Sequence, residues 1–153
     1  MKLAEALITR ADLQKRIEQL KTRLLRNAKI QEGEPPAEDP ASLLAQLNEL
    51  VEQWVTLVQN INRTNSATEV EAGTTITQAI AERDSLKYLH SAYRELAQAA
   101  TVTQERSTKS EVKFKSAISV SETQRSADDF ARRHRELDAK IQATNWETEL
   151  SED

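Results

Sequence analysis

The stretch PASLLAQLNELVEQWVTLVQNI, residues 40–61, decides the fold of this chain. Its apolar residues recur at alternating steps of three and four, the spacing that places side chains on one face of an α-helix. The main stripe consists of Leu43, Leu47, Leu50, Trp54, Leu57 and Ile61, and Leu44, Val51 and Val58 lie alongside it. Asp39 as N-cap and Pro40 at the first helical position start the helix. The sequence predicts a helix over about 40–63 with a broad apolar face.

Three further segments show the same helical period. The first runs from about residue 3 to 30 and ends before Gly33, Pro35 and Pro36, which cannot continue it. The others cover about 77–103, with Thr77 as N-cap, and about 121–146, with Ser121 and Gln124 forming a capping box. Four helices are therefore predicted.

Two segments between the helices favour β-structure. Residues 69–76 contain Gly73 within a short β-prone run, which indicates a small turn or hairpin. Residues 111–118 alternate with a period of two, placing Val112, Phe114 and Ile118 on one face. The predicted fold is mainly α, an elongated antiparallel four-helix bundle or coiled coil with a small β-ribbon, forming one domain over 1–153.

The segment INRTNSAT, residues 61–68, is the most polar part of the second helix. Asn and Ser side chains compete with the helical backbone for hydrogen bonds, so the cluster is predicted to end the helix near residue 63. In the alternative interpretation, Asn62 and Asn65 share one side of a last helical turn and hold a ligand or a polar layer.

Two arginines lie in or beside apolar stripes, each close to an acid. Arg10 is followed by Asp12 in the first helix, and Arg83 by Asp84 in the third. A guanidinium group in an apolar seam needs a partner, so both arginines are predicted to be partly buried and paired. The layer either fixes the register between helices or clamps an anion such as a carboxylate or phosphate.

Composition excludes several classes of function. The 153 residues carry a net charge of −4 and no cysteine, which argues against nucleic acid as a partner and excludes disulfides and thiolate metal sites. The two histidines, His90 and His134, lie on different helices without a metal-binding motif. No catalytic motif, cofactor loop, signal peptide or membrane span is recognisable, so a cytoplasmic non-enzyme without cofactors is expected.

Five strings resemble the bacterial septicolysin-like family when they are taken together. They are RADLQKRIEQL (10–20), NAKIQEGEPPAEDP (27–40), INRTNSAT (61–68), SEVKF (110–114) and TNW (144–146). The resemblance implies a small helical bacterial protein of uncharacterised function, and the family label adds a membrane-active cytolysin as an alternative.

The broad apolar faces suggest what the protein does. A thin bundle buries little surface per residue, so the faces of the second and third helices are expected to be covered by self-association. The sequence therefore predicts a non-enzymatic protein that assembles with itself or binds another helix. An enzyme with a dispersed polar site is the remaining alternative.

Overall fold

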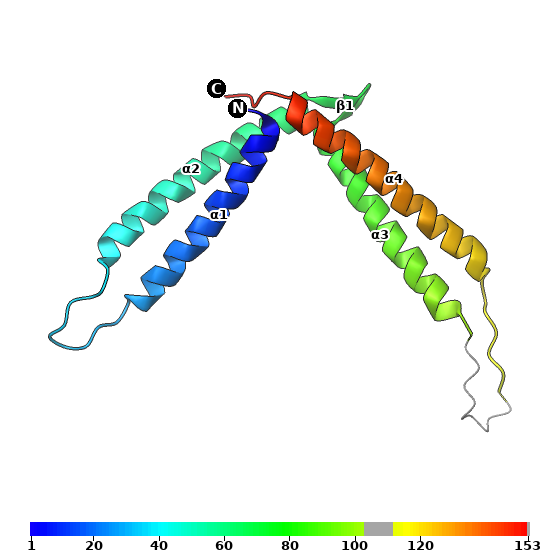
Figure 1. Ribbon diagram of the computed structural model, residues 1–153, viewed down its shortest axis with the longest axis horizontal. Coiled ribbons are helices and arrows are strands. Elements are labelled where there is room, and N and C mark those ends of the chain that lie inside the picture. The colour runs from blue at the N-terminus through cyan, green and yellow to red at the C-terminus, as the bar shows by residue number, and fades with distance from the viewer. Residues whose placement is uncertain (103–111, 153) are drawn as a thin grey trace. The chain divides into compact units, whose positions relative to one another are not determined.

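The computed structural model describes residues 1–102 and 112–152 and is mainly helical (Figure 1). In chain order its elements are α1 (Leu3–Arg26), α2 (Pro40–Ala67), β1 (Glu69–Glu71), β2 (Thr74–Thr75), α3 (Ile76–Ala100) and α4 (Val120–Glu147). The predicted class, four helices with a small β-ribbon, is confirmed. No helix in the described part of the chain is long and apolar enough to cross a membrane.

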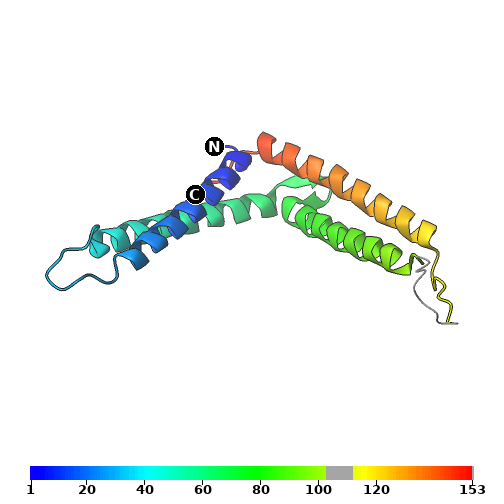
Figure 2. The ribbon, with the colours of Figure 1, turned by 60° about the horizontal axis from the view of Figure 1, so that its bottom comes forward.

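The chain divides into two compact units. One comprises Met1–Glu69 with Gln142–Asp153, and the other comprises Val70–Ile141. Figures 1 and 2 show α1 beside α2 in the first unit and α3 beside α4 in the second, each pair running in opposite directions. That residues 1–153 form one domain stays a prediction.

The α1–α2 hairpin is held by the apolar stripe that the sequence predicts. Leu13 and Leu20 of α1 pack with Leu43 and Leu50 of α2, and all four are buried. Around them lie the partly buried side chains of Ile17, Leu24, Leu47, Trp54 and Leu57. Burying a leucine side chain contributes about 1.5–3 kcal/mol, so this cluster is the main source of stability in the hairpin.

The first helix ends four residues earlier than predicted, because Asn27 terminates it. Its backbone N–H donates to Arg23 O at 3.2 Å, and its side-chain amide donates to the same carbonyl at 2.9 Å. Asn27 Oδ1 accepts from Glu38 N, and the Glu38 carboxylate receives two hydrogen bonds from Arg23. The turn after α1 is therefore tied to the residues just before α2. Asp39 accepts from Ala41 N, as predicted for an N-cap.

The second helix ends within INRTNSAT, but four residues later than predicted, because α2 continues to Ala67 and Thr68 is its C-cap. Thr64 Oγ1 donates to Asn60 O at 2.8 Å, and Ser66 Oγ donates to Asn62 O at 2.9 Å. These hydroxyl groups bond to carbonyls one turn back and leave the backbone ladder intact. The polar cluster is therefore a helical turn.

A β-hairpin and a capping box link α2 to α3. Gly73 adopts φ +83° in the turn between β1 and β2, a conformation that side chains disfavour. Thr75, two residues before the predicted Thr77, is the N-cap of α3: its Oγ1 accepts from Gln78 N, and Gln78 Oε1 accepts from Thr75 N. The predicted hairpin near 69–76 is confirmed.

The second predicted β-segment is not a strand over residues 112–118. Val112 and Phe114 are exposed, so their alternating face does not enter a core, and Ser116 Oγ closes a local turn by accepting from Ile118 N. Residue 111 lies outside the described residues. Next in the chain, Ser119 rather than Ser121 accepts from the first turn of α4, through Glu122 N at 3.3 Å.

Aromatic and backbone contacts join α3 to α4. The rings of Tyr93 and Phe130 meet edge to face with centroids 5.0 Å apart. His90 Nδ1 lies 2.9 Å from Ala127 O, and Ala127 is fully buried. The close approach at Ala127 explains why such small residues line this helix pair.

The two ends of the chain meet within the first unit. Leu3 N donates to Thr148 O at 2.9 Å, and Leu150 N donates to Met1 O at 2.8 Å. The side chain of Lys2 and the N-terminal ammonium group both bind the Glu149 carboxylate. This arrangement, here called the terminal clamp (Met1–Leu3 with Thr148–Leu150), ties the last residues to the start of α1.

The terminal clamp makes the stability of the folded state depend on pH. Hydrogen bonds from Lys2 and the N-terminus lower the pKa of Glu149. A carboxyl group whose pKa is lowered on folding stabilises the fold above its unfolded pKa, about 4.3, and loses that contribution as the pH falls through the folded value. We expect Glu149 to titrate below that reference in an NMR carboxyl titration and Lys2→Met to raise its pKa. Identical titrations in the two proteins would contradict the clamp.

Candidate functional site

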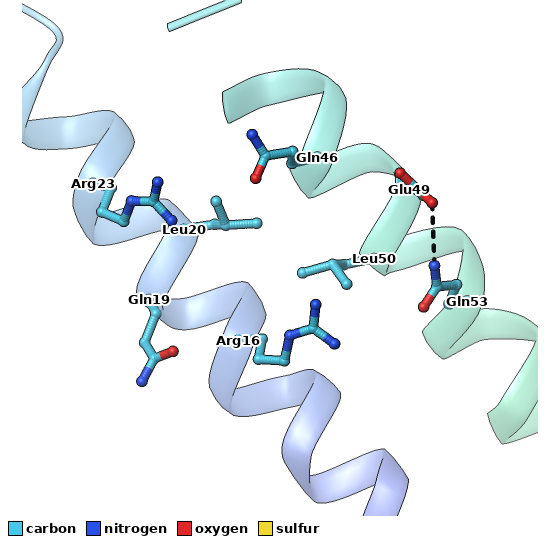
Figure 3. A pocket seen from close by; sticks show the side chains of 8 residues that line it. All are labelled: Arg16, Gln19, Leu20, Arg23, Gln46, Glu49, Leu50 and Gln53. Carbon is cyan, nitrogen blue, oxygen red and sulfur yellow. Dashed lines mark hydrogen bonds between the residues drawn. The ribbon is translucent and has the colours of Figure 1, made fainter. Parts of the chain in front are cut away.

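A depression with a mainly polar lining lies between α1 and α2 (Figure 3). The depression has a volume of about 210 Å³. Its lining residues are Arg16, Gln19, Leu20 and Arg23 of α1 with Gln46, Glu49, Leu50 and Gln53 of α2. Figure 3 shows Leu20 and Leu50 between the helices, surrounded by amide and charged side chains. Polar side chains therefore form the rim of the depression, above the leucines of the hairpin core.

The charged groups of this depression are already engaged or solvated. Arg23 is bound to Glu38, and the hydrogen bond between them lowers the pKa of Glu38. Gln53 Nε2 donates to Glu49 Oε1 at 3.4 Å, and Arg16 is exposed. Catalysis needs a nucleophile or an acid within hydrogen-bonding reach of a base. The lining residues do not form such a pair.

A second, open depression of about 530 Å³ continues along the same face. It shares Glu49 and Gln53 with the first and extends past Glu52 and Thr56 to Leu150. This face of the hairpin, here called the polar face, carries amides, hydroxyls and acids beside the apolar side chains of Met1, Leu13, Leu57 and Leu150.

Arg10 and Asp12 do not form the predicted pair. Arg10 is half-buried and Asp12 is exposed, and no ion pair joins them in the described residues. Side chains two positions apart on a helix point in different directions, which separates them.

Asn62 and Asn65 also take different environments. Asn62 is exposed, whereas Asn65 is half-buried and its Oδ1 has no hydrogen-bond partner among the described residues. Arg10, Asn62 and Asn65 belong to the first unit, whereas Arg83 and Asp84 belong to the second.

Arg83 is paired as predicted, and it has an additional partner. Its Nε lies 3.3 Å from Asp84 Oδ1, and its Nη1 donates to Asp138 Oδ1 of α4 at 2.9 Å. The Arg83 side chain is 24% exposed, so the pair is partly shielded from water. The link from α3 to Asp138 favours the structural interpretation of this arginine. Sequence reasoning missed Asp138 because 55 residues separate it from Arg83.

Replacing Arg83 by Met tests this pair. We expect Arg83→Met to lower the free energy of unfolding by about 1–2 kcal/mol, between the values typical of solvated and buried pairs. Arg132 makes exposed pairs with Asp129 and Glu136 on α4 alone. Its replacement by Met is the matched control and should leave the free energy of unfolding almost unchanged. Equal unfolding midpoints in urea for the two variants would contradict a linking role for Arg83.

The most buried polar residues carry little signal in the sequence. Thr64 is 3% exposed, and its Oγ1 accepts from Ser151 N at 2.9 Å. Asn145 is 4% exposed. Thr64 lies on the same stripe as Ile61, three residues on, and this spacing is the one clue that it faces inward. Through Thr64, INRTNSAT therefore packs in the interior and anchors the C-terminal residues.

Comparison with known proteins identifies the family of the chain. Residues 10–150 match the model of the DUF6847 family of unknown function. The chain belongs to this family. It is also similar, with a TM-score of 0.91 and 42% identity over 99% of each chain, to the crystal structure of a functionally unknown conserved protein from Corynebacterium diphtheriae. No curated protein matches it.

The resemblance to the septicolysin-like family is wrong. The matching model is that of DUF6847, and no septicolysin-like family matches. Of the strings that suggested the resemblance, RADLQKRIEQL lies on α1, TNW on α4 and most of INRTNSAT on α2. The cytolysin alternative, which depended on the label, loses its support.

Proposed function

We propose that this DUF6847 member is a non-enzymatic assembly protein whose α1–α2 hairpin binds a further helix through an exposed apolar stripe on α2. The stripe consists of Leu44, Val51, Val55 and Val58. The first three are 49%, 39% and 41% exposed, and Val58 is half-buried. This stripe is the observation that carries the proposal, and it is called the α2 stripe below.

The α2 stripe is a second apolar face beside the core face. Each of its members follows a core residue by one position, as Leu44 follows Leu43 and Val51 follows Leu50. One residue corresponds to ~100° around an α-helix, so the core residues contact α1 while the α2 stripe points elsewhere. The hairpin core therefore leaves the α2 stripe partly exposed.

Leaving this surface in water is costly. Fully burying a Val or Leu side chain contributes about 1.5–3 kcal/mol, so each half-exposed member of the stripe would gain about 1 kcal/mol from a partner. Single exposed apolar residues are common on soluble proteins, but aligned ones mark interaction surfaces. The spacing of seven, four and three residues is the spacing with which helices pack against helices.

The side chains of the polar face favour a binding function, through the α2 stripe, over a catalytic function. Its best-placed cation, Arg23, is bound to Glu38, and its amides and acids are open to solvent. In residues 1–102 and 112–152, no three His, Asp or Glu side chains gather as metal ligands would.

Light scattering coupled to gel filtration tests the proposal at micromolar concentration. We expect the protein to elute as an oligomer, or as a complex with a partner helix. Val55→Lys should abolish the association because it places a charge in the apolar contact. Thr56→Lys is the matched control, since Thr56 is the next residue and lines the polar face. A monomer that is unchanged by either substitution and binds no helix would contradict the proposal.

A further inference from the structure

We infer that the occupant of the α2 stripe is the same stripe of a second copy, packed antiparallel about a two-fold axis that passes through Val51. This inference rests on the proposed function and specifies its partner. It identifies one helix, one orientation and one central residue.

The order of residues along the α2 stripe has the symmetry that a two-fold axis requires. In such an interface residue i contacts residue j of the partner, and residue j contacts residue i. Leu44 precedes Val51 by seven residues, and Val58 follows it by seven. An axis at Val51 therefore places Leu44 against Val58 of the second copy, and Val51 against its own equivalent. Apolar side chains meet at all three levels.

The fourth member of the stripe also finds an apolar partner. Val55 lies four residues after Val51, so the axis places it opposite Leu47, four residues before Val51. Leu47 is half-buried at the edge of the core face. The contact thus joins the stripe to the core of the second hairpin.

Charge favours a second copy over a charged partner. Between Pro40 and Ile61 the only charged residues are Glu49 and Glu52, and both line the polar face. Gln53 of that face lies two residues from both Val51 and Val55, which is ~200° around the helix. The stripe therefore has no charge of its own with which to select a charged partner, and two stripes can meet without opposing like charges.

The available area is sufficient for a dimer. The face of the hairpin that carries the stripe is two helices, ~20 Å, wide, and the 24 residues of α1 span ~36 Å. Such a face offers about 700 Å² when α1 joins α2 in the contact, close to the ~800 Å² that each partner buries in a specific interface. On α1, Leu25 is 69% exposed and adds apolar surface near the linker end of the hairpin.

Cysteine cross-linking of the full chain tests the axis, because the natural sequence contains no cysteine. Disulfides form only when the two Cα atoms lie within ~7 Å. We expect Val51→Cys to form a covalent dimer on mild oxidation, visible on a non-reducing gel. Val55→Cys is the matched control: antiparallel packing separates its two copies by eight residues, ~12 Å along the axis, so it should remain monomeric on the gel.

Mixing two variants tests the register. Leu44→Cys and Val58→Cys should each fail to cross-link alone and should cross-link when they are refolded together. Circular dichroism confirms that each variant remains helical.

The outcomes separate this inference from the proposed function. Association in light scattering with cross-links at Val55→Cys, or at Leu44→Cys alone, would show parallel packing or a different axis and would overturn the two-fold axis at Val51 while leaving an assembly protein. Association without any of these cross-links would place the interface elsewhere and would also overturn the inference. A monomer at all concentrations would overturn self-association itself.

Discussion

Replacing Ile61 by Ala is expected to lower the free energy of unfolding by about 3 kcal/mol. Ile61 is fully buried in α2, and no solvent reaches its side chain. Truncating a buried isoleucine removes the transfer free energy of its methyl groups and leaves a cavity, which together cost about 2–5 kcal/mol. Urea denaturation followed by circular dichroism measures the change directly.

The matched control for Ile61→Ala is Ile8→Ala in α1. Ile8 is 62% exposed, so the same truncation removes few contacts and should change stability by about 0.5 kcal/mol. Similar midpoints for the two variants would show that Ile61 is not enclosed as the structure has it. A large loss confined to Ile61→Ala would establish that the core of the first unit extends into the INRTNSAT turn.

Replacing Asn62 by Pro should destabilise the protein by about 3 kcal/mol. Proline inside an α-helix removes one backbone hydrogen bond and its ring clashes with the preceding turn. Asn62 is exposed, so the loss reports on the backbone and not on side-chain packing. The effect is expected because α2 runs through this position to Ala67.

Asn62→Ala distinguishes a helical turn from a helix end. Alanine has the higher helix propensity, so in a helical turn the variant should be as stable as the natural protein or slightly more stable. At a helix end the asparagine side chain would be satisfying backbone groups, and its removal would cost about 1 kcal/mol. Thermal melts of the two variants, with Asn62→Pro low and Asn62→Ala unchanged, would support continuous helix.

Local sequence signals predicted the helices well where they act within a few residues. Asp39 and Pro40 start α2 because one caps the backbone and the other presets its conformation. Gly73 marks the hairpin turn because its φ of +83° suits glycine. The leucines of α1 and α2 form the hairpin core because their heptad-like spacing places them on one face of each helix.

The candidate site was less predictable, because side-chain pairing depends on residues brought together from distant segments. Arg83 was expected to find an acid, and Asp84 beside it did pair, but its contact with Asp138 could not be read from spacing along one helix. Arg10 and Asp12 point in different directions on α1, so the predicted layer does not form there.

The sequence by itself determined the four helices of the described residues, the face of α2 that packs, and the breadth of the apolar surface on α2, because helical periodicity acts over single turns. Only the tertiary structure decided where α2 ends and whether residues 112–118 form a strand. Thr64 is buried and accepts a hydrogen bond from Ser151, 87 residues away in the chain, so the polar turn around it stays helical. Val112 and Phe114 are exposed, so their alternating face does not enter a core, and an alternating segment without a buried face gains too little to offset the entropy of ordering it as a strand.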